Sequence, residues 1–345
     1  MRHAKILGLF FVIAVAHTAA ICLASANESI QADTSLQTPP VVTAPNTSTQ
    51  SNTPKTELAW ADVVEQSPNL KVVTDADFLA RIAATGLPWR VKDKGTGIEM
   101  LLVPPGKFIM GMSPGDTEAS DNEKPAHEVT LTKPFYLGRT EVTQPQWVKV
   151  AGNNPSNFHS GRDRDSMIAK LMNEGLTKSE AEAKAAEESN DKDALPVEDV
   201  SRNICQQFFF AKTSLRLPTE AEWEYACRAG VRKPTYGDLD DIAWFDKNSS
   251  GTTHIVGKKL PNALGFYDMI GNVFEWCSDI YGAKYYKSCQ DGVLDPIATE
   301  GSAFVLRGGY WDTGSSFCRS SARCVYVVTA DYRNSGIGFR VARTP

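Results

Sequence analysis

The stretch LRLPTEAEWEYACRAG, residues 215–230, contains the clearest helix signal in the sequence. Thr219 is followed three residues later by Glu222, which is the capping-box pattern at the start of a helix. Gly230 is the kind of residue that commonly ends one. We therefore predict a helix over residues 220–229 and work outward from it to the fold class.

Short strand-like runs precede this helix. Residues 98–112, IEMLLVPPGKFIMGM, form two such runs around a Pro-Pro-Gly turn, and residues 127–143, HEVTLTKPFYLGRTEVT, alternate like a strand before they turn. A capping box at Thr143 predicts a second helix, which ends near Gly152, and Ser201 caps a third. After the central helix the chain is rich in Gly, Asn, Asp and Trp without long periodic stretches. This pattern predicts an α+β fold with little regular secondary structure.

The first residues have the pattern of a signal peptide. Two basic positions precede the apolar run 6–16, which is too short to span a bilayer comfortably, and Ala24-Ser25-Ala26 is a small-residue cleavage site. We predict a signal peptide over 1–26 and an exported protein, periplasmic or extracellular. Cys22 could instead mark a lipoprotein, although the isoleucine before it fits that signal poorly. No second long apolar run follows, so we expect no integral membrane span in the mature chain.

Composition divides the rest of the chain. Residues 27–57 are rich in Thr, Ser, Pro, Gln and Asn without aromatics, which predicts a disordered linker. Residues 58–94 are predicted as a short helical lead-in, with a helix capped by Thr74. The main domain is expected over 95–345. Within it, the charged, Ala-rich segment 161–193 predicts an inserted solvated pair of helices, with a partner-binding excursion as the alternative.

Charge and motifs exclude several function classes. The formal net charge is −5 and no basic block occurs, so we expect no nucleic-acid partner. Histidines are too isolated to suggest a metal centre. Phosphate loops, dinucleotide glycine motifs and the Gly-x-Ser-x-Gly elbow are all absent from the sequence.

The run YDMIGNVFEWCSD, residues 267–279, suggests a calcium site. Asp268 and Glu275 supply hard oxygen donors, and Gly271 with Asn272 between them allows a tight turn that aims backbone carbonyls inward. Carboxylates together with carbonyls suit Ca²⁺, which takes six to eight oxygen ligands. The alternative is ordinary capping and hydrogen bonding around the turn.

Seven motifs occur in an order that resembles the formylglycine-generating enzyme, or sulfatase-modifying factor, family. The resemblance covers about residues 95–344 and implies one large α+β domain of the formylglycine-generating-enzyme type, related to the C-type lectin fold. It also implies calcium held by the side chains of Asp268 and Glu275 and the carbonyls of Gly271 and Val273. The motifs are LLVPPGKFIMG, FYLGRTEVTQPQW, PVEDVS, LRLPTEAEWEYACRAG, GFYDMIGNVFEWCSD, VLRGGYW and IGFRVAR.

The resemblance raises the question of copper in the stretch 307–324, RGGYWDTGSSFCRSSARC. The family's founding activity oxidises a sulfatase cysteine to formylglycine with O₂ and uses a pair of cysteine thiolates that bind Cu(I), a soft ligand set for a soft metal. Counted from the glycine pair, the two copper positions are Thr313 and Cys318. Tyr310 occupies the position of an oxidase serine. Cu(I) and a catalytic Cys318 are therefore expected only if oxidase activity is retained.

The resemblance also implies a disulfide and a surface cleft. The family's helix cysteine corresponds to Cys227, and its partner here is Cys324, or Cys318 if the loop shifts. Trp311, Arg319 and Arg323 are expected around the cleft, where the arginines would bind an anion; the alternative is that they form salt bridges that lock loops. No pairing is assigned to the remaining cysteines, Cys205, Cys277 and Cys289.

Three functions compete. The first is a noncatalytic version of the fold that holds a protein or peptide ligand, the second is a different periplasmic oxidase, and the third is formylglycine generation. Thr313 argues against the third, and the lack of a histidine cluster argues against an iron-based second. We expect a monomer, and whether the chain is an enzyme stays open at this point.

Overall fold

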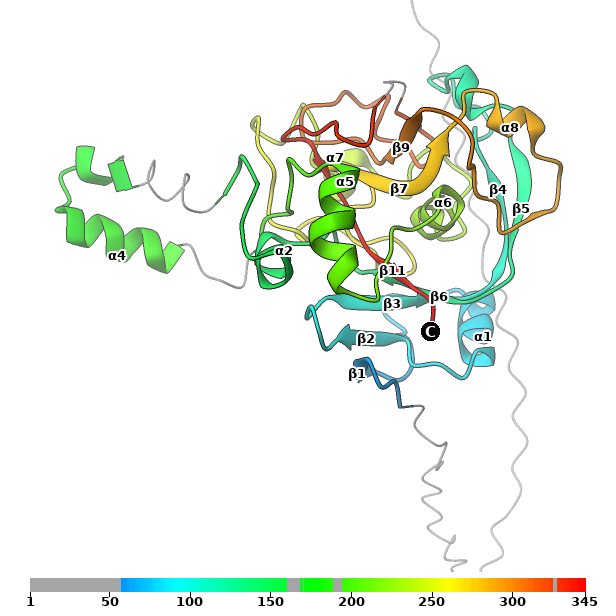
Figure 1. Ribbon diagram of the computed structural model, residues 1–345, viewed down its shortest axis with the longest axis horizontal. Helices are drawn as coiled ribbons and strands as arrows, with labels where there is room; N and C mark the ends of the chain where they lie inside the picture. Colours follow the sequence, from blue (N-terminus) through cyan, green and yellow to red (C-terminus); the bar gives the residue numbers. More distant parts are fainter. Residues whose placement is uncertain (1–56, 160–167, 170, 189–193, 325–327) are drawn as a thin grey trace, which may run out of the picture. The chain divides into compact units, whose positions relative to one another are not determined.

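The computed structural model of this chain describes residues 57–159, 168–169, 171–188, 194–324 and 328–345 (Figure 1). Contacts divide the chain into Met1–Thr53 and Pro54–Pro345, and every described residue belongs to the second unit. The predicted signal peptide, almost all of the predicted linker and much of the predicted insertion lie outside the described residues. Of that insertion, the structure describes helix α4, Lys178–Glu188.

A five-stranded sheet forms one part of the domain, in the order β1-β2-β3-β6-β11 (Figure 1). All its pairings are antiparallel. The lead-in segment therefore does more than carry a helix, because its strands β1 and β2 extend the sheet next to β3. The strands are β1, Ala61–Glu65; β2, Arg90–Asp93; β3, Glu99–Val103; β6, Phe135–Gly138; and β11, Ala342–Arg343.

The lead-in helix α1, Ala76–Ala84, begins one residue later than the sequence suggested. Its N-cap is Asp75, whose side chain accepts a hydrogen bond from the Phe78 N–H at 2.8 Å, so the predicted cap at Thr74 is wrong. Phe78 and Ile82 are buried in the main core. The helix is thus anchored to the domain by its apolar face.

Two three-stranded sheets complete the strand content, in the orders β4-β5-β8 and β10-β7-β9. The predicted strand runs around the Pro-Pro-Gly turn are β3 and β4, which confirms that part of the sequence interpretation. The bounds are β4, Gly106–Met110; β5, His127–Leu131; β7, Phe274–Tyr281; β8, Val293–Leu294; β9, Ala303–Arg307; and β10, Ile337–Gly338.

Most of the helices are short, and four of those described begin with a capping side chain that accepts a backbone N–H. The predicted boxes are present at Thr143, which opens α2, and at Thr219, which opens α6. None of the described helices has the length and apolar character needed to cross a bilayer. The helical elements not yet given are α2, Gln144–Ala151; α5, Arg202–Ile204; α6, Glu220–Arg228; α7, Leu239–Ile242; α8, Tyr285–Ser288; a π-helical turn, Cys205–Phe209; and 3₁₀ turns at Asp121–Glu123 and Phe210–Lys212.

Helix α6 lies at the centre of the domain, and every residue in it except Glu222 is buried. Trp223 is fully enclosed, and the charged residues Glu220, Glu224 and Arg228 are buried with it. Buried charges require partners, since removing an ion from water is costly. The elements that pack around α6 must therefore supply opposite charges as well as a complementary surface.

Candidate functional site

The loop after β9 brings the two expected copper positions together. The Oγ1 of Thr313 lies 3.7 Å from the Sγ of Cys318. Gly309 permits this loop conformation, because its φ is +78° and a Cβ at this position would stand 2.9 Å from the Cys318 sulfur. The spacing read from the glycine pair thus corresponds to a real contact.

The pair does not form a two-thiolate copper site. The Thr313 hydroxyl already closes a turn, since it accepts from the Tyr310 N–H at 2.9 Å and donates to the Tyr310 carbonyl at 2.8 Å. Burial raises the pKa of the Cys318 thiol to about 12, although its hydrogen-bond contact with Thr313 acts in the opposite direction. Thr313 supplies only a hard hydroxyl oxygen, so Cys318 alone remains of the soft two-thiolate site that Cu(I) prefers. These residues do not fit the metal.

Aromatic side chains flank the pair. The Tyr310 ring packs against Phe274, with centroids 5.2 Å apart, and it covers Gly336 closely enough that a Cβ there would collide with the ring. Trp311 is half-buried, meets Phe158 edge-on at 5.3 Å, and donates from its indole N–H to the Ser335 carbonyl at 3.0 Å. Trp311 is thus held firmly while part of its surface stays accessible.

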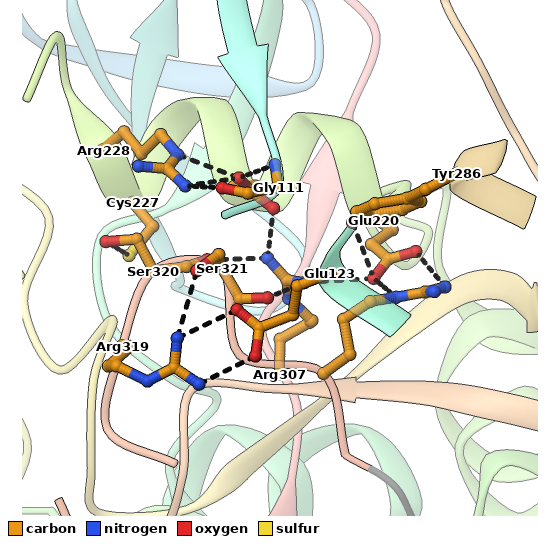
Figure 2. A network of polar contacts seen from close by, with 12 residues as sticks. Gly111, Glu123, Glu220, Cys227, Arg228, Tyr286, Arg307, Arg319, Ser320 and Ser321 are labelled. Atoms are coloured by element: carbon orange, nitrogen blue, oxygen red, sulfur yellow. Dashed lines mark hydrogen bonds and ion pairs between the residues drawn. The ribbon is translucent and has the colours of Figure 1, made fainter. Parts of the chain in front are cut away.

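The two arginines expected in the cleft are buried instead, so that prediction is wrong. Arg319 is 5% exposed and binds Glu123 at 2.7 Å (Figure 2). It also contacts Asp116 at 2.7 Å. Arg323 is 2% exposed and binds Glu220 through both Nε, at 2.6 Å, and a terminal nitrogen, at 2.9 Å. Although burial opposes ionisation of Glu123, the Arg319 guanidinium outweighs it and holds the pKa of Glu123 below its usual value. The salt-bridge alternative is the one that the structure supports.

These pairs belong to one buried network that fixes the loop to α6 (Figure 2). Arg307 contacts Glu220 at 3.0 Å and Glu224 at 2.5 Å, and its guanidinium also donates to the carbonyl of Ser320 at 2.6 Å. Arg228 holds Glu224 from the other side at 2.8 Å. Four arginines therefore face four carboxylates, and the charges balance. The network is Arg228, Arg307, Arg319 and Arg323 with Asp116, Glu123, Glu220 and Glu224.

The predicted disulfide is not formed. Cys227 is a free buried thiol, and its sulfur donates to the hydroxyl of Ser320 at 3.5 Å. The loop thus places a serine opposite Cys227, whereas Cys318 lies beside Thr313. Burial raises the pKa of Cys227 to about 12, so the thiol is neutral and packs as a small apolar group.

The expected calcium turn contains two very different carboxylates. Asp268 is buried; its Oδ2 accepts from the Gly257 N–H at 2.6 Å, while its Oδ1 has no hydrogen-bond partner among the described residues. Both oxygens of Glu275 receive the Arg340 guanidinium at 2.6 Å, and Oε2 also accepts from the Trp223 indole at 2.7 Å. Glu275 would have to share its oxygens with any cation.

The sequence interpretation missed a third carboxylate here, Glu141. It is fully buried and accepts from the side-chain amide of Asn272 at 2.8 Å and from the Val273 N–H at 3.1 Å. Burial, followed by the charges of Asp268 and Glu275, raises its pKa well above the usual value. No local spacing could have revealed it, because its partners are more than 130 residues away in the chain.

Charge is therefore unbalanced at this turn, in contrast to the arginine network. Three buried carboxylates, Glu141, Asp268 and Glu275, share the guanidinium of Arg340, and the ammonium of Lys259 adds a weaker positive charge near Asp268. Burial and the mutual repulsion of these carboxylates raise the pKa of Glu141 and of Asp268, and a cation that relieves this repulsion would also supply a partner for the Oδ1 of Asp268. No group of three or more His, Cys, Asp or Glu side chains among the described residues converges on one metal position, so carbonyls would have to complete the ligand set. Calcium binding stays a prediction.

Calcium should raise the melting temperature of the wild type relative to protein in chelator, because the ion would neutralise charge that is now uncompensated. Asp268→Ala should abolish this difference, since it removes the unpartnered oxygen. The measurement is thermal unfolding with added calcium and with chelator. Glu300→Ala, at an exposed position, is the control and should keep the wild-type response. A calcium response that survives in Asp268→Ala would place the ion elsewhere.

Comparison with known proteins identifies the family to which this chain is similar. The family model described as "Sulfatase-modifying factor enzyme 1-like domain" matches residues 85–345. The formylglycine-generating enzyme of Streptomyces coelicolor is 30% identical over 281 residues, which cover 70% of this chain and 87% of that protein. The serine/threonine-protein kinase pkn1 of Chlamydia caviae is 31% identical over 261 residues, 73% of this chain but 39% of its own length. The present chain thus spans well under half of that relative.

Two solved structures extend the likeness to three dimensions. PvdO from Pseudomonas aeruginosa has a TM-score of 0.56 and 25% identity, with 74% of this chain and 98% of that chain covered. Treponema denticola variable protein 1 has a TM-score of 0.52 and 26% identity, with 72% and 95% covered. The mixed fold with little regular secondary structure is the one that the sequence predicted. The chain belongs to the sulfatase-modifying factor, or formylglycine-generating enzyme, family.

Proposed function

We propose that this chain is an exported, noncatalytic member of the family that holds a protein or peptide ligand on the surface beside Cys318. The observation that carries the proposal is the contact between Thr313 and Cys318 at 3.7 Å. It puts a hydroxyl, already used in a turn, where a second thiolate would be needed. The export rests on the signal-peptide pattern of residues 1–26.

The surroundings of Cys318 support binding rather than oxidation. Tyr310, at the position of the oxidase serine, fills the space over Gly336 and is held there by Phe274. Trp311 and Phe158 are half-buried beside it. Rigid aromatic side chains that are partly accessible are well suited to anchoring a peptide, because little side-chain entropy is lost on binding.

The wild type should leave a sulfatase-motif peptide unchanged when the two are incubated aerobically after Cu(I) loading. Conversion of a cysteine to an aldehyde lowers the peptide mass by about 18 Da, which mass spectrometry detects directly. Thr313→Cys should bind Cu(I) more tightly than the wild type in competition with a chromophoric chelator. Turnover should stay low until Tyr310→Ser is added, since the tyrosine ring blocks the approach.

Asp312→Cys is the matched control, because it adds a thiol one residue away at an exposed position. It should leave Cu(I) affinity close to that of the wild type. Oxidation of the peptide by the unmodified protein would overturn the proposal and support the formylglycine-generating alternative.

Peptide binding is tested with a displayed peptide library. Selection on the wild type should enrich sequences that the Trp311→Ala variant no longer retains.

A further inference from the structure

A hollow lies away from the Cys318 loop, between residues of the five-stranded sheet and the end of α2. It has a volume of about 500 Å³, within the range of small-ligand sites. Its walls come from the turn between β2 and β3, the end of α2, the segment before α6, and β11. The lining residues used in the argument are Trp60, Asp93, Lys94, Lys149, Lys212 and Arg343.

The hollow is strongly cationic in a chain whose formal net charge is −5. Three lysines and one arginine line it against a single carboxylate. Lys94 has only a loose ion pair, 3.9 Å from Asp62. Lys149 and Lys212 have no carboxylate partner within the described part of the chain. Positive charge is therefore concentrated here and left uncompensated.

The one carboxylate in the hollow is already in use. Asp93 is 6% exposed, and its Oδ1 accepts from both the N–H and the hydroxyl of Thr96, at 2.7 and 2.8 Å. Arg343 lies between this carboxylate, 3.9 Å away, and the face of the Trp60 ring, 4.1 Å from the centroid. Asp93 thus holds the turn and the arginine in place rather than neutralising the lysines.

The lysines are also partly positioned before any ligand arrives. Lys212 donates from Nζ to the carbonyl of Val150 at 3.2 Å, which ties it to the end of α2. The Nζ of Lys149 lies 3.8 Å from where a Cβ on Gly97 would stand, so it reaches across to the β2–β3 turn. The ammonium groups therefore reach the hollow from different elements.

We propose that this hollow binds a small hydrophilic ligand that carries two or more phosphate or sulfate groups. Single contacts to exposed lysines are weak and easily screened by salt, so useful affinity requires several anionic groups on one molecule. The polar walls, with the Trp60 face covered by Arg343, disfavour an apolar ligand. The hollow shares no residue with the Cys318 loop. Its ligand can therefore be tested independently of the proposed function.

The test is calorimetric titration of the intact chain at low ionic strength with tripolyphosphate, a polysulfated disaccharide and inorganic phosphate. We expect saturable binding of at least one multivalent probe, at least tenfold tighter than inorganic phosphate and weakened by added salt. The tighter of the first two probes distinguishes a phosphate from a sulfate ligand. The double variant Lys149→Gln/Lys212→Gln should lose at least tenfold in affinity.

The matched control removes two other exposed lysines, Lys71→Gln/Lys287→Gln, which lie outside the hollow. It changes net charge equally and should alter affinity by less than twofold. Equal losses in the two double variants would show diffuse attraction and overturn the proposal. So would wild-type protein that binds no multivalent probe saturably. Thermal unfolding of each variant confirms that it is folded before titration.

Discussion

Arg307→Leu should destabilise the domain more than any other single substitution considered for this chain. The guanidinium is completely buried and neutralises Glu220 and Glu224, and it also binds the Ser320 carbonyl. Although burial alone would lower the pKa of Arg307, the neighbouring carboxylates raise it well above its usual value. Removing one partner of a buried pair costs about 3–5 kcal/mol, because the remaining charge stays buried.

That loss is a large share of a typical domain's stability and should lower the melting temperature by about 10 °C or prevent folding. Arg216→Leu is the matched control. Arg216 also binds a glutamate of α6, Glu222, at 2.6 Å, but its side chain is 37% exposed. Exposed pairs contribute about 1 kcal/mol or less, so this variant should unfold within a few degrees of the wild type. Similar losses in the two variants would contradict the role of burial.

Ser320→Cys should have the largest stabilising effect. The Ser320 hydroxyl lies 3.5 Å from the Cys227 sulfur, so a cysteine there should form a disulfide on oxidation. The two residues are 93 apart in the chain, and closing a loop of that length stabilises the fold by about 4–5 kcal/mol in the chain-entropy model. Thiol titration of the denatured, unreduced protein detects the disulfide as a loss of two free thiols. Thermal unfolding with and without reductant measures how much the disulfide raises the melting temperature.

Ser321→Cys is the control for this bridge. Ser321 is equally buried, but its hydroxyl faces Arg319, which donates to it at 3.3 Å. The added thiol should therefore stay reduced, and reductant should leave the melting temperature of this variant unchanged. If Ser320→Cys also kept every thiol titratable under oxidising conditions, the contact with Cys227 would be wrong.

Local structure was largely readable from the sequence. The hydrogen bonds of the capping boxes at Thr143 and Thr219 join residues that are three apart in the chain. A short sequence pattern therefore contains both partners of each bond. The two strands on either side of the Pro-Pro-Gly turn were predicted from their apolar runs, although β3 and β4 belong to different sheets. The ordered motifs also identified the family, and the two positions counted from the glycine pair, Thr313 and Cys318, lie in contact.

The site residues that were misjudged all depend on distant partners. Arg319 binds a glutamate 196 residues away in the chain, and Arg323 binds one 103 residues away. Their burial therefore could not be predicted from the residues next to them in sequence. The sequence predicted Cys324 or Cys318 as the disulfide partner of Cys227, but Ser320 lies opposite that cysteine. The path of the loop decides which side chain faces the helix, and this path depends on distant contacts.

The sequence by itself determined the capped helices, the short strands and the family, because these depend on short-range hydrogen bonds and on an ordered set of motifs. Only the tertiary structure decided how charge is distributed. It paired four arginines with four carboxylates around α6, left Glu141, Asp268 and Glu275 with one arginine, and gathered lysines around an open hollow. The reason is physical: the free energy of a charge depends on its burial and its neighbours, and both are set by chain segments far apart in sequence.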